Sequence, residues 1–125
     1  MTRPIFLNLL QIKFPVTAIV SILHRVSGVV IFLAVPLVYT WLYMSICSES
    51  SYASLAVMSG QWFIKILYLL IIIAVLFHAL AGIRHMYYDF SSDHGLAGAK
   101  KTAWAIIFLT VILSAMAAYR IFVQV

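Results

Sequence analysis

Three long apolar runs decide what this chain can fold into. They cover residues 27–47, 62–83 and 103–123, and each has the roughly 20 residues that a helix needs to cross a hydrocarbon layer about 30 Å thick. The mean hydropathy is +1.13, with 66% hydrophobic and 9% charged residues, which excludes an ordinary soluble domain. We therefore predict an all-α integral membrane protein with three transmembrane helices in one domain, residues 1–125.

The chain before the first apolar run is mixed in character, and we assign residues 1–20 to the membrane interface. Pro15 can begin a helix, because its φ angle is preset and the first helical turn needs no N–H from it. The helical pattern then continues without a break to Cys47. Cys47 is the only cysteine, so no disulfide can form within the chain and no Cys-x-x-Cys motif exists.

The connections between the apolar runs are polar. Residues 48–61 are rich in serine, and we predict an external turn there. Residues 91–101, "SSDHGLAGAKK", predict an interfacial link at the other side of the membrane. We expect the third run to contribute packing, because apart from Arg120 near its end its polar content is limited to small hydroxyls and one tyrosine.

The net charge of +5 comes from Lys and Arg residues that are scattered, so it does not indicate a nucleic-acid partner. Six of them lie before the first run or between the second and third, and two lie at the opposite ends: Arg3, Lys13, Arg25, Arg84, Lys100 and Lys101, against Lys65 and Arg120. This bias predicts a cytoplasmic N-terminus and a periplasmic C-terminus. We find no convincing cleavable signal or transit sequence, which favours a bacterial inner membrane.

The segment "SILHRVSG" places polar side chains at the start of the first apolar run. Ser21, His24, Arg25 and Gly28 are spaced i, i+3, i+4 and i+7, which puts them on one helical face near the headgroup boundary. A snorkelling arginine and a back-bonded serine would explain two of them without any site. The stripe as a whole contains four residues that are unusual on a lipid-facing surface, and this favours a polar site.

A second polar stripe ends the second run, in "HALAGIRHMYYDF". His78, Gly82 and His85 follow the spacing i, i+4, i+7, and His78 lies inside the apolar segment. An imidazole within a membrane span is a candidate proton relay or metal ligand, and a plain interhelical hydrogen bond is the simpler alternative.

The two stripes are expected to converge, because the first two helices are antiparallel. Convergence would place Arg25 and Arg84 around His78, with Gly28 and Gly82 as flat spots where a planar ring could approach the backbone. A haem b fits this arrangement, with its iron on a neutral imidazole and its anionic propionates toward arginine and histidine.

One chain is not expected to supply both axial ligands. His78 and His85 are ~10 Å apart along one helix, whereas two axial nitrogens lie about 4 Å apart across an iron. His24 is possible but lies close to the membrane edge. We therefore expect the second axial ligand from another polypeptide.

The remaining polar residues can serve quinone chemistry. Reduction of a quinone needs hydrogen-bond donors to its carbonyl oxygens, a nearby cation and a proton route. Ser21 and Arg25 meet the first two needs. Asp89 is a candidate stop on the proton route, or an ion-pair partner of Arg84 or Arg25.

The segments "FPVTAIVSILHRVSG" and "HALAGIRHMYYDF", in this order and separation, resemble the cytochrome b large membrane-anchor subunit of bacterial succinate dehydrogenase, a succinate:quinone oxidoreductase. The resemblance implies that His78 is an axial haem ligand and that Ser21 and Arg25 line the ubiquinone pocket. It also places His24 and His85 near the haem propionates, on the side where Arg25 lies.

The resemblance implies a set of partners as well. A second, smaller three-helix anchor subunit would complete a helix bundle and donate the other axial histidine. An iron-sulfur subunit and a flavoprotein subunit would dock on the cytoplasmic face. The residues alone leave two alternatives open: a small proton-coupled transporter or channel subunit, with His78 as relay and Arg25 as anion site, and a purely structural assembly subunit.

Overall fold

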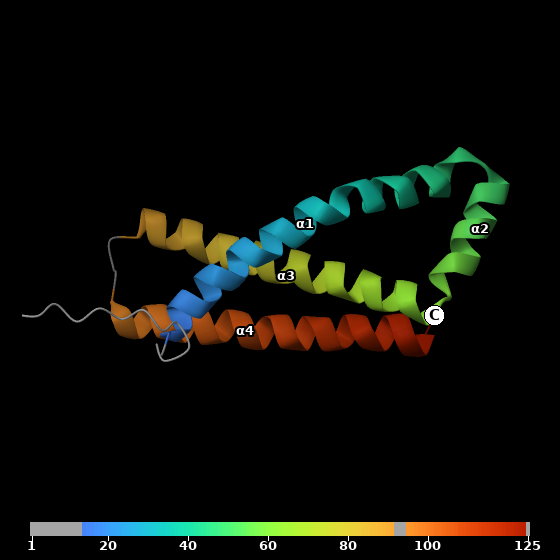
Figure 1. Ribbon diagram of the computed structural model, residues 1–125. Coiled ribbons are helices and arrows are strands. Elements are labelled where there is room, and N and C mark those ends of the chain that lie inside the picture. The colour runs from blue at the N-terminus through green and yellow to red at the C-terminus, as the bar shows by residue number, and fades with distance from the viewer. Residues whose placement is uncertain (1–13, 92–94, 125) are drawn as a thin grey trace, which may run out of the picture.

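The computed structural model describes residues 14–91 and 95–124, and this part of the chain is helical with no strand (Figure 1). The elements in chain order are α1 Val16–Cys47, α2 Glu49–Ser59, α3 Trp62–Phe90, α4 Leu96–Tyr119 and the π-helical turn η1 Arg120–Gln124. Helices α1, α3 and α4 are long and apolar enough to cross a membrane. The predicted all-α fold with three spans is confirmed.

The long helices extend beyond the predicted apolar runs at one end of the molecule. There, α1 begins at Val16, α3 continues to Phe90 and α4 begins at Leu96. We call this the histidine end, since it carries His24, His78 and His85. High hydropathy identifies only the residues that cross the hydrocarbon layer, whereas a helix can continue into the membrane interface with polar side chains. Of the predicted interfacial segment, residues 16–20 are helical, and residues 1–13 lie outside the described chain.

The external turn predicted for residues 48–61 is wrong, because most of it forms helix α2. The Ser48 hydroxyl accepts a hydrogen bond from the Ser51 backbone N–H at 3.1 Å and so caps the helix, while Glu49 stands in the first turn, where a negative charge is favourable. No residue of α2 is buried. The predicted link at residues 91–101 is likewise shorter, since α4 begins within it.

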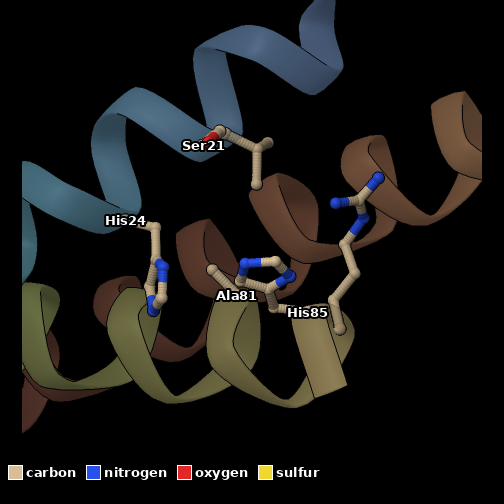
Figure 2. Close-up of a pocket in the computed structure, with 6 residues that line it drawn as sticks. Ser21, His24, Ala81 and His85 are labelled. Atoms are coloured by element: carbon tan, nitrogen blue, oxygen red, sulfur yellow. The ribbon is translucent and has the colours of Figure 1, made fainter. Parts of the chain in front are cut away.

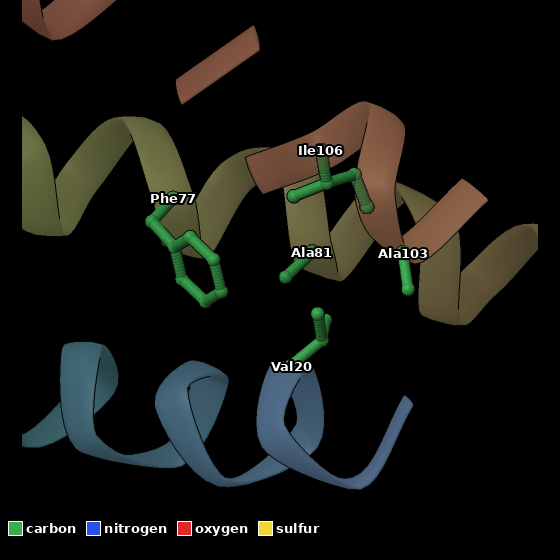
Figure 3. Packing of buried hydrophobic residues seen from close by; sticks show 5 residues of the cluster. All are labelled: Val20, Phe77, Ala81, Ala103 and Ile106. Atoms are coloured by element: carbon green, nitrogen blue, oxygen red, sulfur yellow. The ribbon is translucent and has the colours of Figure 1, made fainter. Parts of the chain in front are cut away.

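Small side chains let the three long helices approach one another at the histidine end. Val20 of α1, Phe77 and Ala81 of α3, and Ala103 and Ile106 of α4 point toward a common centre (Figure 3). Ala103 is completely buried. Helices in lipid associate by close packing rather than by the hydrophobic effect, so alanine at a crossing point is favourable.

At the opposite end, α1 diverges from α3 and α2 bridges the two (Figure 1). Tyr68 of α3 holds this end together. Its ring centroid lies 4.2 Å from that of Trp41 in α1, and its hydroxyl is 2.9 Å from the Ser59 hydroxyl in α2. An aromatic ring with a polar tip suits the boundary between lipid and water.

We predict that Ala103→Leu destabilises the bundle by about 1–3 kcal/mol, because added carbon atoms have no room at a fully buried crossing point. Thermal unfolding of the detergent-purified protein measures the effect. The exposed Ala105 on the same helix supplies the control, and Ala105→Leu is expected to unfold near the wild-type temperature. Equal losses in the two variants would contradict the packing described here.

Candidate functional site

His78 of α3 is held by two groups from α1. Its Nδ1 lies 3.1 Å from the Ser27 hydroxyl and 3.1 Å from the backbone carbonyl oxygen of His24. Ser27 is 7% exposed, and its hydroxyl donates to the same carbonyl oxygen at 2.8 Å. The sequence analysis did not select Ser27 as a site residue. The sequence feature that could have indicated Ser27 is its position one turn after His24 and next to Gly28.

Two glycines allow the imidazole rings to lie against the helix backbones. A Cβ atom on Gly28 of α1 would be 3.1 Å from Cε1 of His78, and one on Gly82 of α3 would be 3.5 Å from Nε2 of His24. The two rings stack between the helices with centroids 4.2 Å apart and planes tilted by 27°. The predicted flat spots therefore do receive planar rings, but these rings are the imidazoles of the facing helix.

A small pocket opens beside the stacked histidines (Figure 2). Ser21 and His24 of α1 face Ala81 and His85 of α3 across it. Its volume is about 90 Å³, and Val20 and Arg84 complete the lining. The His85 ring meets the His24 ring edge-on, with centroids 6.4 Å apart. The structure thus brings the two predicted polar stripes together.

Arg84 links the pocket to α4. Its Nε donates to the Thr102 hydroxyl at 3.1 Å, and one of its terminal nitrogens donates to the Ala99 carbonyl oxygen at 3.1 Å. The guanidinium also lies 4.8 Å from the ring centroid of Tyr88, whose hydroxyl is 3.0 Å from that of Thr102. These contacts fasten the end of α3 to the first turns of α4.

Arg25 lies outside this pocket. Its side chain is exposed on α1, and it is not among the lining residues, although Ser21 is. Ser21 and Arg25 are one helical turn apart, as the sequence predicts. However, α1 presents Val20, His24 and Ser27 to α3 and leaves Arg25 at the edge of this helix contact. Within the described part of the chain, Arg25 is therefore not brought together with the other predicted site residues.

Asp89 pairs with His85 rather than with either arginine that the sequence analysis considered. Its Oδ1 lies 3.8 Å from Nδ1 of His85, one turn earlier on α3. Both side chains are mostly exposed. A surface pair of this kind contributes little to stability.

The donor set fits a haem better than a bare metal ion. Among the described residues, no group of three or more His, Cys, Asp or Glu side chains could hold a metal ion. A haem brings four nitrogen ligands of its own and needs only axial ones from protein. His24 and His78 are stacked face to face, so this arrangement does not point their nitrogens at each other across an iron.

Comparisons with known proteins identify the family of the chain. The family model for the succinate dehydrogenase/fumarate reductase transmembrane subunit matches residues 1–117. The succinate dehydrogenase cytochrome b556 subunit of Coxiella burnetii is 33% identical over 117 residues, covering 92% of this chain and 93% of the relative. The corresponding subunit of Rickettsia bellii is 30% identical over 112 residues (90% and 87%), and that of Paracoccus denitrificans is 28% identical over 121 residues (97% and 93%). The chain belongs to the family of succinate dehydrogenase/fumarate reductase transmembrane subunits, the membrane anchors of succinate:quinone oxidoreductase.

Proposed function

We propose that this membrane-anchor subunit binds a haem b through His78 and forms part of the quinone site beside it. The observation that carries the proposal is the position of the His78 ring, which lies within a membrane span with its Nδ1 held by α1. Its other ring nitrogen, Nε2, is therefore the one available to iron. When bound, the haem would serve as a one-electron carrier.

The haem propionates are assigned to the histidine end. His24 and His85 line the pocket there, and Arg25 is exposed next to it. Imidazole and guanidinium N–H groups bind carboxylates through charge-assisted hydrogen bonds. Since Arg84 already donates to Thr102 and Ala99, Arg25 is the more suitable arginine for an added anion.

The quinone site is assigned to Ser21 and Arg25, with ubiquinone as the substrate implied by the family resemblance. Ser21 would donate a hydrogen bond to a carbonyl oxygen, and Arg25 would stabilise negative charge on the ring. The pocket of about 90 Å³ is much smaller than the roughly 300–1,000 Å³ of typical ligand sites. We therefore assign the rest of the quinone site to partner subunits.

The same reasoning leads to partners and an orientation. A second, smaller anchor subunit would donate the other axial histidine and cover exposed apolar faces of α1 and α3. An iron-sulfur subunit and a flavoprotein subunit would dock at the histidine end. The described cations concentrate at that end, which supports a cytoplasmic histidine end, with the N-terminus cytoplasmic and the C-terminus periplasmic, in a bacterial inner membrane.

We predict that His78→Ala removes one axial ligand, because the imidazole assigned to the iron is lost. The reduced-minus-oxidised visible spectrum of the purified complex should lose the signature of a six-coordinate b-type haem. His85→Ala removes an imidazole two turns further along the same face of α3 without removing an axial ligand, so it should keep six-coordination. A six-coordinate haem that persists in His78→Ala would refute the ligand assignment, and a relay role for His78 would then have to be considered.

A graded series at Gly28 tests whether the position of the His78 ring controls haem binding. The Cβ of Gly28→Ala would approach Cε1 of His78 to 3.1 Å, so the ring must shift by a few tenths of an ångström, and Gly28→Val would displace it further. Haem content per flavin is expected to fall from wild type to Gly28→Ala and further in Gly28→Val. Alanine favours a helix over glycine by about 1 kcal/mol, so a loss of haem in Gly28→Ala would not result from a weakened helix.

Gly98→Ala controls this series, since its added Cβ would meet only the Tyr88 hydroxyl at 3.9 Å. Its haem content should equal that of wild type. Normal haem content in Gly28→Val would contradict the proposed arrangement.

Arg25→Leu is expected to lower quinone turnover by roughly 100-fold, the usual scale for loss of a group that stabilises developing charge. Succinate oxidation with a soluble dye as electron acceptor should persist, because that assay bypasses the quinone. Lys65→Leu, which removes a cation at the opposite end, should change neither rate. If Arg25→Leu lost both activities equally, the residue would instead be needed for assembly.

A further inference from the structure

We infer that Ser27 is a positioning residue for His78: its hydroxyl and the carbonyl oxygen of His24 together keep the proton on Nδ1 and leave the Nε2 lone pair for iron. This inference rests on the proposed haem ligation by His78. Ser27 and Thr110 are the buried polar residues of the described chain, and Ser27 is the one that contacts a histidine.

The hydrogen-bond directions at Ser27 follow from the number of available protons. The hydroxyl has one proton and donates it to the His24 carbonyl oxygen at 2.8 Å. In its 3.1 Å contact with His78 Nδ1, the Ser27 oxygen must therefore accept. The carbonyl oxygen, also 3.1 Å from Nδ1, can only accept.

Both contacts require a proton on Nδ1 of His78. A neutral imidazole carries one N–H, so Nε2 is left with an unshared electron pair. Neutral imidazole with a free nitrogen is the form that binds a metal. Helix α1 thus selects the tautomer of a ligand that α3 carries.

The same contacts fix the ring orientation. A half-turn of the ring would place a C–H group where Nδ1 now donates, and both hydrogen bonds would be lost. The Cε1 edge lies against Gly28, close enough that even a methyl group there would be tight. The ring is therefore held on two sides before any cofactor binds.

An acceptor at Nδ1–H also changes the electronic character of the ligand. It raises the basicity of the ligating nitrogen, which favours oxidised over reduced iron. Removal of the Ser27 hydroxyl should raise the haem midpoint potential. Loss of such a supporting partner typically costs 10–100-fold in metal affinity, and we expect about tenfold, because the His24 carbonyl oxygen remains.

Ser45 provides a matched control on the same helix. Its hydroxyl donates to the Leu42 carbonyl oxygen at 2.7 Å, three residues earlier, as the Ser27 hydroxyl does to His24. Ser45 is partly exposed and lies in the last turn of α1, at the end of the helix opposite the histidine end. Ser45→Ala removes the same type of local hydrogen bond without touching the ligand.

The test uses the purified complex with all its subunits. Potentiometric titration of the b-type haem and the largest g value in the electron paramagnetic resonance spectrum are compared in wild type, Ser27→Ala, Ser27→Thr and Ser45→Ala. Ser27→Ala should raise the midpoint potential and shift the g value. Ser27→Thr keeps the hydroxyl, and its methyl can enter the groove of about 350 Å³ that Ser27 borders, so wild-type values should return. Ser45→Ala should match wild type.

His78→Ala separates the two possible failures. If it leaves a six-coordinate haem, the ligand proposal fails and the inference about Ser27 falls with it. If it removes the ligand while Ser27→Ala keeps the wild-type potential and g value, only the inference about Ser27 fails. Equal shifts in Ser27→Ala and Ser45→Ala, or loss of haem in Ser27→Thr as well as in Ser27→Ala, would also overturn it.

Discussion

The close contact between α1 and α3 at two facing histidines is the interaction on which the site depends. Each imidazole lies on a glycine of the other helix, and the rings stack between them. A helix pair in lipid gains little from the hydrophobic effect, so direct packing and interhelical hydrogen bonds decide where it meets. At this crossing both are present, because His78 also hydrogen-bonds to α1. The residues proposed for chemistry thus also hold the helices together.

The rest of the molecule is open, as expected for one subunit of an assembly. In the most apolar windows of the three spanning helices, 17%, 17% and 11% of the residues are buried. The pocket at the histidine end is too small for a quinone, and Arg25 stands outside it. Under the proposed function, the chain contributes half-sites: an imidazole with one nitrogen committed to α1, and an exposed serine and arginine. Under the proposed function, partner subunits would turn these groups into complete sites.

Sequence reasoning could predict the spans and both polar stripes, because hydropathy and the 3.6-residue period are local properties of the chain. It missed α2, since the capping of that helix by Ser48 was hidden in a serine-rich segment. It also expected Arg25 in the common pocket and did not select Ser27. Which side of a polar stripe meets the neighbouring helix depends on how the two helices cross. At that crossing Gly28 leaves room for the His78 ring, and helical spacing alone does not give this fit.

The first turns of α4 contain none of the residues proposed for chemistry, yet they divide the work between the two arginines. The Ala99 carbonyl oxygen and the Thr102 hydroxyl occupy the Arg84 guanidinium. Because α4 engages Arg84, the proposed function assigns the propionate and the quinone to the exposed Arg25. The first turns of α4 thereby hold Arg84 in the wall of the pocket, whereas Arg25 stays exposed outside it.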